Sequence, residues 1–267
     1  MRSMTFAQLN GRWLAIAMLT MFVAAPSAAA STADADLQRE VEQRLSKKEA
    51  VAAKIDVAVA NDVVTLTGVL ASLWETEWAV ERVEKTDGVV TVVSQLTIVV
   101  PRPDADLAAL VADAIGRYPY YTVFDHVTAS VQNGVVTLKG DVTATPDKPA
   151  DIRERVSKVV GVHQIVNDIE ILSPGIGDGR LRYALARQLF SHPSLGRYNG
   201  YNPGIHIIVK TGYVTLKGTV YDEGDRLIAD SVARRTFGVI RVYNELKLRN
   251  EVVVPAAAPP TRSGVVN

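Results

Sequence analysis

Apolar residues recur first at helical spacing and then at strand spacing, in the same order, three times along the chain. Each pass begins with apolar residues four positions apart, a period typical of one face of an α-helix. Alternating apolar and polar residues follow, as in "HVTASV" and "IHIIVK", and this alternation predicts a strand with one buried face. The three helical sets are Leu37, Val41 and Leu45; Leu107, Val111 and Ile115; and Leu181, Leu185 and Leu189.

A tight turn and a returning strand come next, in three near copies of one phrase. Asn-Gly between alternating runs indicates a hairpin, because a type I′ turn needs positive φ at both central residues. The valine and leucine of each phrase are predicted to enter a core, and the threonine between them to face outward. The phrases are "ANDVVTLTGVL" (60–70), "QNGVVTLKGDV" (132–142) and "KTGYVTLKGTV" (210–220), with turns at Asn61-Asp62, Asn133-Gly134 and Thr211-Gly212 and threonines Thr65, Thr137 and Thr215.

A second helix and a last strand complete each pass. Apolar pairs at i, i+4 spacing predict the buried face of this helix. A glycine follows each pair, where a left-handed C′ residue would end the helix. The pairs and their glycines are Ala79, Val83 and Gly88; Ile152, Val156 and Gly161; and Ala229, Ala233 and Gly238.

The repeated order is therefore α-β-β-α-β, and the predicted fold class is α+β. Two landmarks that keep their register through three copies indicate a tandem repeat. Two helices are expected to cover one face of a three-stranded sheet in each copy, which is enough for a very small domain. The predicted domains are 34–100, 101–173 and 174–250. The pattern leaves the position of the third strand in each sheet open.

This order, the "VTLxG" hairpin and the closing phrase "GVxxVxNxLxL" resemble the BON domain. The closing phrase is matched in the second and third copies, whereas the first has Ser94 in place of the asparagine. The architecture resembles that of OsmY-type periplasmic proteins with tandem BON domains. The resemblance implies phospholipid binding, a role in osmotic or envelope stress, in some members chaperone-like action on outer-membrane proteins, and no enzymatic chemistry. The matching residues are Gly161, Val162, Ile165, Asn167, Ile169, Ile171, Gly238, Val239, Val242, Asn244, Leu246 and Leu248.

The first thirty residues have the layout of a secretory signal peptide. Arg2 and Arg12 precede an apolar run of about 13 residues, and small residues suited to cleavage after Ala30 follow. A membrane span needs roughly 20 residues, so an anchor is the weaker interpretation. We expect an exported, periplasmic protein with a disordered tail at 251–267. Its stability must come from packed cores, because the chain has no cysteine and thus no disulfide.

Charge is distributed unevenly among the copies. Without residues 1–30 the chain has 27 basic and 29 acidic residues, a net charge of −2, which argues against nucleic acid as a partner. Residues 34–100 carry 7 basic and 12 acidic side chains, net −5, and residues 101–173 carry 7 and 10, net −3. Residues 174–250 carry 12 and 6, net +6. The third domain is therefore the candidate to contact an anionic surface.

Basic residues of domain 3 on one helical face would dock weakly and salt-dependently on anionic lipid, at about 1 kcal/mol each at best. A solvated helical surface, or a contact with acidic domain 1, would also explain them. The candidate lipid-binding residues on the two helices are Arg180, Arg182, Arg187, Arg234 and Arg235.

Aromatic residues gather between the first helix and first strand of copies two and three. Tyrosine suits a lipid interface because one end is apolar and the other polar, but such rings also cover core edges or pack between domains. Trp74 and Trp78, one helical turn apart, fit an interdomain contact as well as lipid. The candidate rims are Tyr118, Tyr120, Tyr121 and Phe124, and Phe190, Leu195, Tyr198 and Tyr201.

Motifs for catalysis, cofactors or metals are not recognisable. The four histidines lack metal-ligand spacing, and repeat geometry accounts for His126 and His206. "SPGIGDGRL" lacks the lysine of a phosphate loop and is interpreted as a linker that ends at a helix N-cap, Asp178. The leading hypothesis is a non-enzymatic envelope-stress protein that docks reversibly on anionic phospholipid through domain 3. The alternative is a module or holdase-type chaperone that binds outer-membrane or periplasmic proteins through its aromatic edges.

Overall fold

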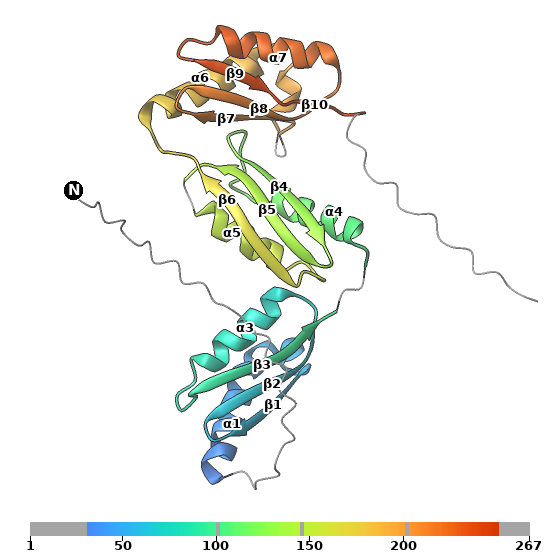
Figure 1. Ribbon diagram of the computed structural model, residues 1–267, viewed down its shortest axis with the longest axis vertical. Helices are drawn as coiled ribbons and strands as arrows, with labels where there is room; N and C mark the ends of the chain where they lie inside the picture. Colours follow the sequence, from blue (N-terminus) through green and yellow to red (C-terminus); the bar gives the residue numbers. More distant parts are fainter. Residues whose placement is uncertain (1–30, 100–101, 145–146, 201–202, 251–267) are drawn as a thin grey trace, which may run out of the picture.

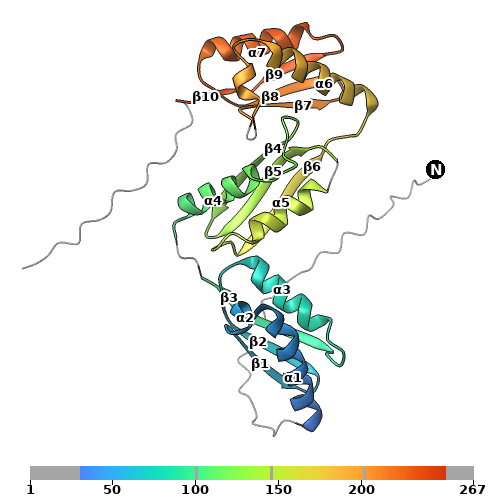
Figure 2. The same ribbon diagram turned by 180° about the vertical axis from the view of Figure 1, so that it is seen from behind.

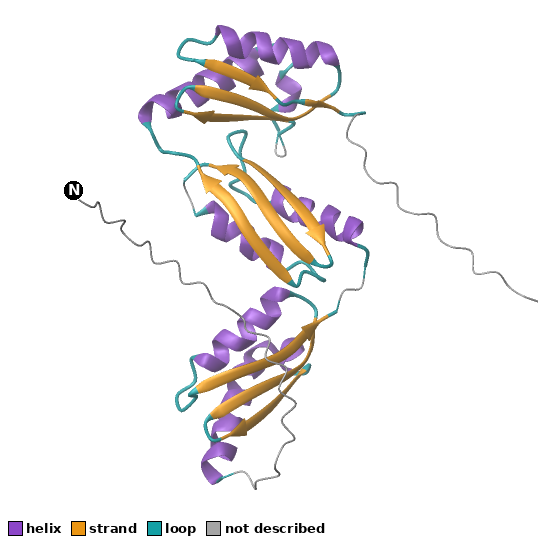
Figure 3. Cartoon of the chain, viewed as in Figure 1, coloured by secondary structure: helices purple, strands orange, loops and turns teal. Residues whose placement is uncertain are grey.

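The computed structural model describes residues 31–99, 102–144, 147–200 and 203–250. The predicted signal peptide and the predicted tail lie outside these residues. Three α+β units follow one another along the chain, each with its own hydrophobic core (Figure 1). The α-β-β-α-β order in each unit confirms the predicted fold class (Figure 3).

Domain 1 begins with α1 (Thr32–Leu45), followed by the short helices η1 (Ser46–Lys48) and α2 (Glu49–Ala52), which the sequence pattern did not predict. The hairpin β1 (Ile55–Ala60) and β2 (Val63–Leu70), helix α3 (Leu73–Glu84) and strand β3 (Thr91–Ile98) complete it. Strand β2 is central, antiparallel to β1 and parallel to β3. This answers the open question of the third strand: it pairs with the second strand of the hairpin.

Domain 2 repeats this topology with α4 (Asp104–Gly116), β4 (His126–Gln132), β5 (Val135–Val142), α5 (Lys148–Ser157) and β6 (Gln164–Ile171). Domain 3 has α6 (Ile176–Ser191), η2 (Gly196–Tyr198), β7 (Ile205–Lys210), β8 (Tyr213–Val220) and α7 (Glu223–Arg235). Its third strand is split into β9 (Arg241–Asn244) and β10 (Lys247–Leu248), and both pair parallel with β8.

The repeated phrase has the expected place in each core. Val64, Leu66, Val136, Leu138, Val214 and Leu216 are buried, whereas the intervening threonines are half-buried on the other face of each sheet. Both residues of each turn have positive φ, as predicted. Figure 2 shows that the two main helices of each unit cover the same face of its sheet.

The last glycine of each phrase has a steric role. At Gly140, φ is +141°, and a Cβ atom would lie 2.0 Å from the carbonyl oxygen of His126 on the neighbouring strand. Gly68 and Gly218 face the carbonyls of Lys54 and Gly204 in the same way. Only a residue without a side chain fits this approach of two backbones.

Two local predictions were wrong. Gly88, Gly161 and Gly238 have positive φ but lie past the C-caps, in the turn to the last strand, and not at the C′ position. The N-cap of α6 is Gly175, not Asp178. The Asp178 carboxylate instead accepts hydrogen bonds from the backbone of Thr211 (2.6 Å) and Gly212 (2.9 Å) in the hairpin turn.

Candidate functional site

Three of the residues proposed for an aromatic rim are core residues. Tyr118, Leu195 and Tyr198 are buried, so the prediction that they form an exposed edge is wrong. The Tyr118 hydroxyl donates to Asp151 (2.5 Å) on α5, and the Tyr198 hydroxyl donates to Asp225 on α7. Burial and these carboxylates raise the pKa of both phenols. The rings fasten a loop to the second helix of their own domain.

The remaining aromatic candidates lie in different surroundings. Tyr121 is half-buried, its hydroxyl accepts a hydrogen bond from the Val127 amide (2.8 Å), and burial raises its pKa to about 12. Phe190 is half-buried against the core of domain 3. Tyr120 is 59% exposed, and Tyr201 lies outside the described residues. Tyr120 is thus the one described ring of the proposed rims that faces solvent.

The arginine candidates also divide by environment. Arg182 is buried and donates to the carbonyl oxygens of Val209 (2.8 Å) and Ser173 (3.4 Å), so it cannot reach a membrane. Arg180, Arg187 and Arg235 are exposed. Arg234 is exposed but forms an ion pair with Asp230 (2.6 Å), which satisfies its charge within α7.

Sequence reasoning missed three strongly exposed aliphatic and phenylalanine side chains of domain 3. Phe237 is 99% exposed, Ile240 67% and Ile176 75%. Phe237 and Ile240 lie in the turn between α7 and β9, and Ile176 begins α6. The signal was present: in a turn that reads "TDGVV" in copy one, copy three reads "TFGVI".

These residues lie at one end of the domain. The Ile240 amide donates to Gly212 in the β7–β8 turn (2.9 Å), and Asp178 of α6 holds the same turn. The start of α6, the hairpin turn and the α7–β9 turn thus meet at the end of domain 3 that is remote from β10 (Figure 1). We call the exposed residues at this end the domain 3 tip: Ile176, Arg180, Arg235, Phe237, Ile240 and Arg241.

The equivalent end of domain 2 is covered by domain 1. The Gly161 amide donates to Ala71 (3.0 Å), and the Leu73 amide donates to Val162 (3.1 Å). Leu73 also packs against the hydrophobic core of domain 2. The same turn that joins domain 2 to domain 1 is therefore the turn that domain 3 presents to solvent.

Two charged contacts support the contact between domains 1 and 2. Arg153 forms a bidentate pair with Glu77, in which Nη1 lies 3.1 Å from Oε2. The Lys158 ammonium lies 5.4 Å from the centre of the Trp74 ring, so the interdomain interpretation of Trp74 is confirmed. Trp78 stacks with Lys48 and Arg82 inside domain 1.

A different surface joins domains 2 and 3. The Ile207 amide of β7 donates to Val123 (2.7 Å), and Lys210 pairs with Asp141 (2.6 Å) and Glu170 (2.8 Å). The rings of His126 and His206 meet at 5.2 Å. Repeat geometry therefore does not account for these two histidines: they are partners across the interface.

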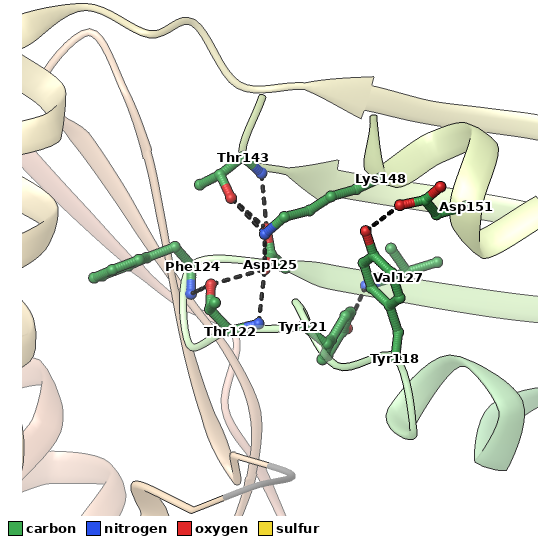
Figure 4. A network of polar contacts seen from close by, with 9 residues as sticks. All are labelled: Tyr118, Tyr121, Thr122, Phe124, Asp125, Val127, Thr143, Lys148 and Asp151. Carbon is green, nitrogen blue, oxygen red and sulfur yellow. Dashed lines mark hydrogen bonds and ion pairs between the residues drawn. The ribbon is translucent and has the colours of Figure 1, made fainter. Parts of the chain in front are cut away.

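The loop of domain 2 at this interface is held by a buried polar network (Figure 4). The Asp125 carboxylate accepts from the Lys148 ammonium (2.6 Å), from Thr122 (2.7 Å, amide and hydroxyl alike) and from Thr143 (2.7 Å from the amide, 3.0 Å from the hydroxyl). Asp125 and Lys148 are both buried. The network fixes residues 122–126 where they meet β7.

An open groove of about 700 Å³ lies on the helical side of domain 2, between α4 and α5. Leu110, Tyr120 and Val160 give it an apolar lining, and Arg102, Arg117, Arg155 and Lys158 add positive charge. Asp113, Asp151 and Glu154 offset three of these four charges, so the lining keeps an excess of only one positive charge.

Among the described residues, no cluster of three or more histidine or acidic side chains is arranged to hold a metal ion. In the same residues, no helix has the length and hydropathy of a membrane span.

The structure is a tandem array of small α+β units that contact one another through defined surfaces. The BON domain model matches residues 33–100, 103–173 and 178–250, so the chain belongs to the BON domain family. Domains of this family are associated with phospholipid binding in envelope and osmotic-stress proteins and are generally non-catalytic.

Solved structures add little to this assignment. The chain is similar to the C-terminal domain of CdsD, a structural protein of the type III secretion system of Chlamydia trachomatis, with 15% identity and a TM-score of 0.23. That match covers 80% of this chain and 97% of the other. A second CdsD structure matches with 14% identity, a TM-score of 0.22 and coverage of 82% and 96%. No curated protein matches the chain.

Proposed function

We propose that this protein is an exported, periplasmic BON protein that docks reversibly on anionic phospholipid through the domain 3 tip. The observation that supports the proposal is a phenylalanine with 99% of its surface exposed, in the only domain with a net positive charge. An exposed apolar group ringed by cations fits the boundary between lipid headgroups and acyl chains.

The expected binding energy is small. Phe237 contributes about 1.5–3 kcal/mol if it is fully buried in the acyl region. Arg180, Arg235 and Arg241 add about 1 kcal/mol each at an anionic surface, and less at higher salt. Such a sum supports reversible binding and not permanent anchoring.

Flotation of the intact chain with vesicles tests the proposal. Vesicles with anionic lipid are expected to retain the protein, and zwitterionic vesicles or high salt to release it. Phe237→Ser is expected to lower the partition coefficient roughly tenfold, the loss of about 1.4 kcal/mol. Leu227→Ser is the matched control, since Leu227 is exposed on α7 of the same domain but outside the tip.

Charge reversal tests the electrostatic contribution to membrane binding separately from the apolar contribution of Phe237. The triple variant Arg180→Glu, Arg235→Glu and Arg241→Glu is expected to abolish the preference for anionic lipid. Reversal of Arg249, which follows β10 at the other end of the domain, is the control. Equal binding by the triple variant and the control would remove the role assigned to the tip.

A second candidate function is protein binding, for which the groove on domain 2 is the supporting observation. Leu110, Tyr120 and Val160 expose apolar surface there. A holdase role predicts that Tyr120→Ser weakens protection of an unfolding outer-membrane protein, whereas the tip variants leave it unchanged. The opposite pattern would favour lipid docking alone.

A further inference from the structure

The contact between domains 2 and 3 contains two histidines with no acid partner on their rings. His126 of β4 is half-buried and His206 of β7 is buried, and their rings pack edge to face at 5.2 Å. Nδ1 of His206 is buried and forms no hydrogen bond within the described residues. A protonated imidazole needs an acceptor at both nitrogens, so this arrangement suits the neutral ring.

Charged and titratable neighbours of the pair come from both domains. The positive charge of Lys217 acts on His126. Lys217 lies 3.9 Å from both Asp141 and Glu245, and Lys210 pairs with Asp141 and Glu170. The Asp125 carboxylate is taken up by Lys148 and the two threonines. Among the described residues, the charged and titratable groups around this contact include Tyr121, Asp125, Asp141, Lys148, Glu170, Lys210, Lys217 and Glu245.

The pKa values agree with this geometry. Burial, with the charges of His206 and Lys217, lowers the pKa of His126 to about 4, against an opposing effect of Asp141. Burial lowers the pKa of His206, although the backbone and the charge of Asp125 and the backbone of Thr122 and Pro203 oppose the shift. Both rings therefore remain neutral at pH 7 while the domains are in contact.

We propose that the His126–His206 pair is an acid-sensitive latch that holds domain 3 against domain 2 at neutral pH and releases it when the pH falls. In the separated state both rings are exposed to water and regain their ordinary pKa, near 6.5. Protons then bind more tightly to the separated state, and acid shifts the equilibrium toward it.

The sign and size of the effect follow from linkage. Because the pKa is lowered in the docked state, the docking free energy is fully present above pH 6.5 and decreases as the pH falls toward 4. His126 alone weakens docking by about tenfold per pH unit across this window. His206 adds to this effect. The ion pair with Lys210 lowers the pKa of Glu170, so protonation of Glu170 weakens docking in the same direction at lower pH.

The rest of the interface suits a reversible contact. Outside the histidines, the contacts within the described residues include one backbone hydrogen bond, the ion pairs of Lys210 and Lys217, and the packing of Phe124 against the core of domain 3 and edge to face on Tyr183 (5.2 Å). Exposed ion pairs contribute little, about 0–1 kcal/mol each. A change of tenfold per pH unit is therefore large enough to open such an interface. The latch does not depend on membrane docking.

Pulsed electron–electron double resonance measures the distance between two spin labels on the intact chain and so tests the latch. The absence of native cysteine allows two spin labels, on Ser130→Cys in β4 and Leu227→Cys in α7, both exposed positions. A single narrow distance is expected at pH 7.5. A broad distribution is expected at pH 4.5, with a midpoint between pH 4 and 6.5.

Variants assign the transition to the two rings. His126→Gln with His206→Gln removes both titrating groups and is expected to keep the narrow distance down to pH 4.5. His163→Gln, a histidine in the turn before β6, is the matched control and should open like the wild type. Opening of the double variant at the wild-type midpoint would overturn the proposal.

A second measurement does not depend on any variant. Proton NMR titration of the unlabelled chain reports each histidine directly, and circular dichroism at pH 4.5 verifies that the domains remain folded. The latch requires two imidazoles that titrate below their ordinary range. If all of the histidines titrate near pH 6.5 with no change in domain separation, the proposal is wrong.

Discussion

Gly140 shows how one residue type supports the fold at a specific atom. The substitution Gly140→Ala places a methyl group 2.0 Å from the carbonyl oxygen of His126, at a φ of +141°. We expect a loss of about 2 kcal/mol or more in the stability of domain 2, from strain and strand separation. Amide hydrogen exchange along β5 measures this loss of stability.

Gly177→Ala provides the contrast within the same chain. This glycine lies in α6, and no atom lies within 4 Å of the place that a Cβ atom would take there. Because alanine favours the helix, we expect a gain of about 0.4–1 kcal/mol. Similar losses for both substitutions would show that backbone approach is not the reason for the repeated glycine.

The buried pair of Lys148 and Asp125 is the second residue-scale feature with a large expected effect. Lys148→Met leaves the Asp125 carboxylate buried without its cation, which costs about 3–5 kcal/mol. Arg39→Met breaks the exposed Arg39–Asp36 pair and should cost less than about 1 kcal/mol. Chemical denaturation compares the two, and equal losses would contradict the role given to the network.

At the scale of elements, each first helix holds the hairpin turn of its own domain by one carboxylate. Asp104 accepts from the amides of Asn133 (2.7 Å) and Gly134 (3.1 Å), as Asp178 does in domain 3. In domain 1, hydrogen bonds with Ser31 and with the turn backbone lower the pKa of Asp34. That contribution to stability is present at neutral pH and is lost as acid protonates the carboxyl.

The Asp104 contact can be tested without disturbing the core. Asp104→Ala leaves two turn amides without their acceptor, and we expect a loss of about 1–3 kcal/mol. The rate of hydrogen exchange at the Asn133 and Gly134 amides should increase. Asp106→Ala, an exposed position on the same helix, is the control and should leave both amides unchanged.

Much of each unit could be predicted at this scale. Alternation in "VVTLKG" and four-residue spacing in the helices reflect which side chains are buried, so the order of elements follows from them. The short helices η1, α2 and η2 carry no periodic signal over so few residues. The split between β9 and β10 was not predicted from the sequence. Leu246 is buried like a strand residue, although it lies between the two segments that pair with β8.

The candidate site was less predictable than the fold. Tyr118 and Tyr198 have the composition of an interfacial rim, but only tertiary structure shows that Asp151 and Asp225 receive their hydroxyls. Arg182 sits on the same helix as Arg180 and Arg187 yet points into the interior. Phe237 was accessible to sequence reasoning, through comparison of the three equivalent turns.

At the scale of the whole molecule, domain 2 contacts its two neighbours through different surfaces. Within the described residues, the contact with domain 1 includes the Glu77–Arg153 pair and no pair of histidine rings. We therefore expect it to remain closed at pH 4.5, when the contact with domain 3 opens. Spin labels placed in domains 1 and 2 provide the measurement, and joint opening of both contacts would contradict this difference.

The contact between domains 1 and 2 should instead respond to charge. Glu77→Arg places two guanidinium groups together, and we expect a closed fraction lowered severalfold, consistent with the modest energy of a half-exposed pair. Small-angle X-ray scattering should show an increased radius of gyration. The exchanged pair, Glu77→Arg with Arg153→Glu, should restore the compact form; failure to do so would show that the pair does not hold the interface.

The same helix-to-strand turn is a joint in domain 2 and a free end in domain 3. The role of such a domain thus depends on its position in the tandem array and on a few residues in one turn. Grafting "TFGVI" into domain 2 would put a phenylalanine at position 160, beside the open groove and the contact with domain 1, and grafting "VVGVH" into domain 3 would remove the exposed phenylalanine from its tip. Lengthening such a chain by a fourth unit would hide the present end and create a new one.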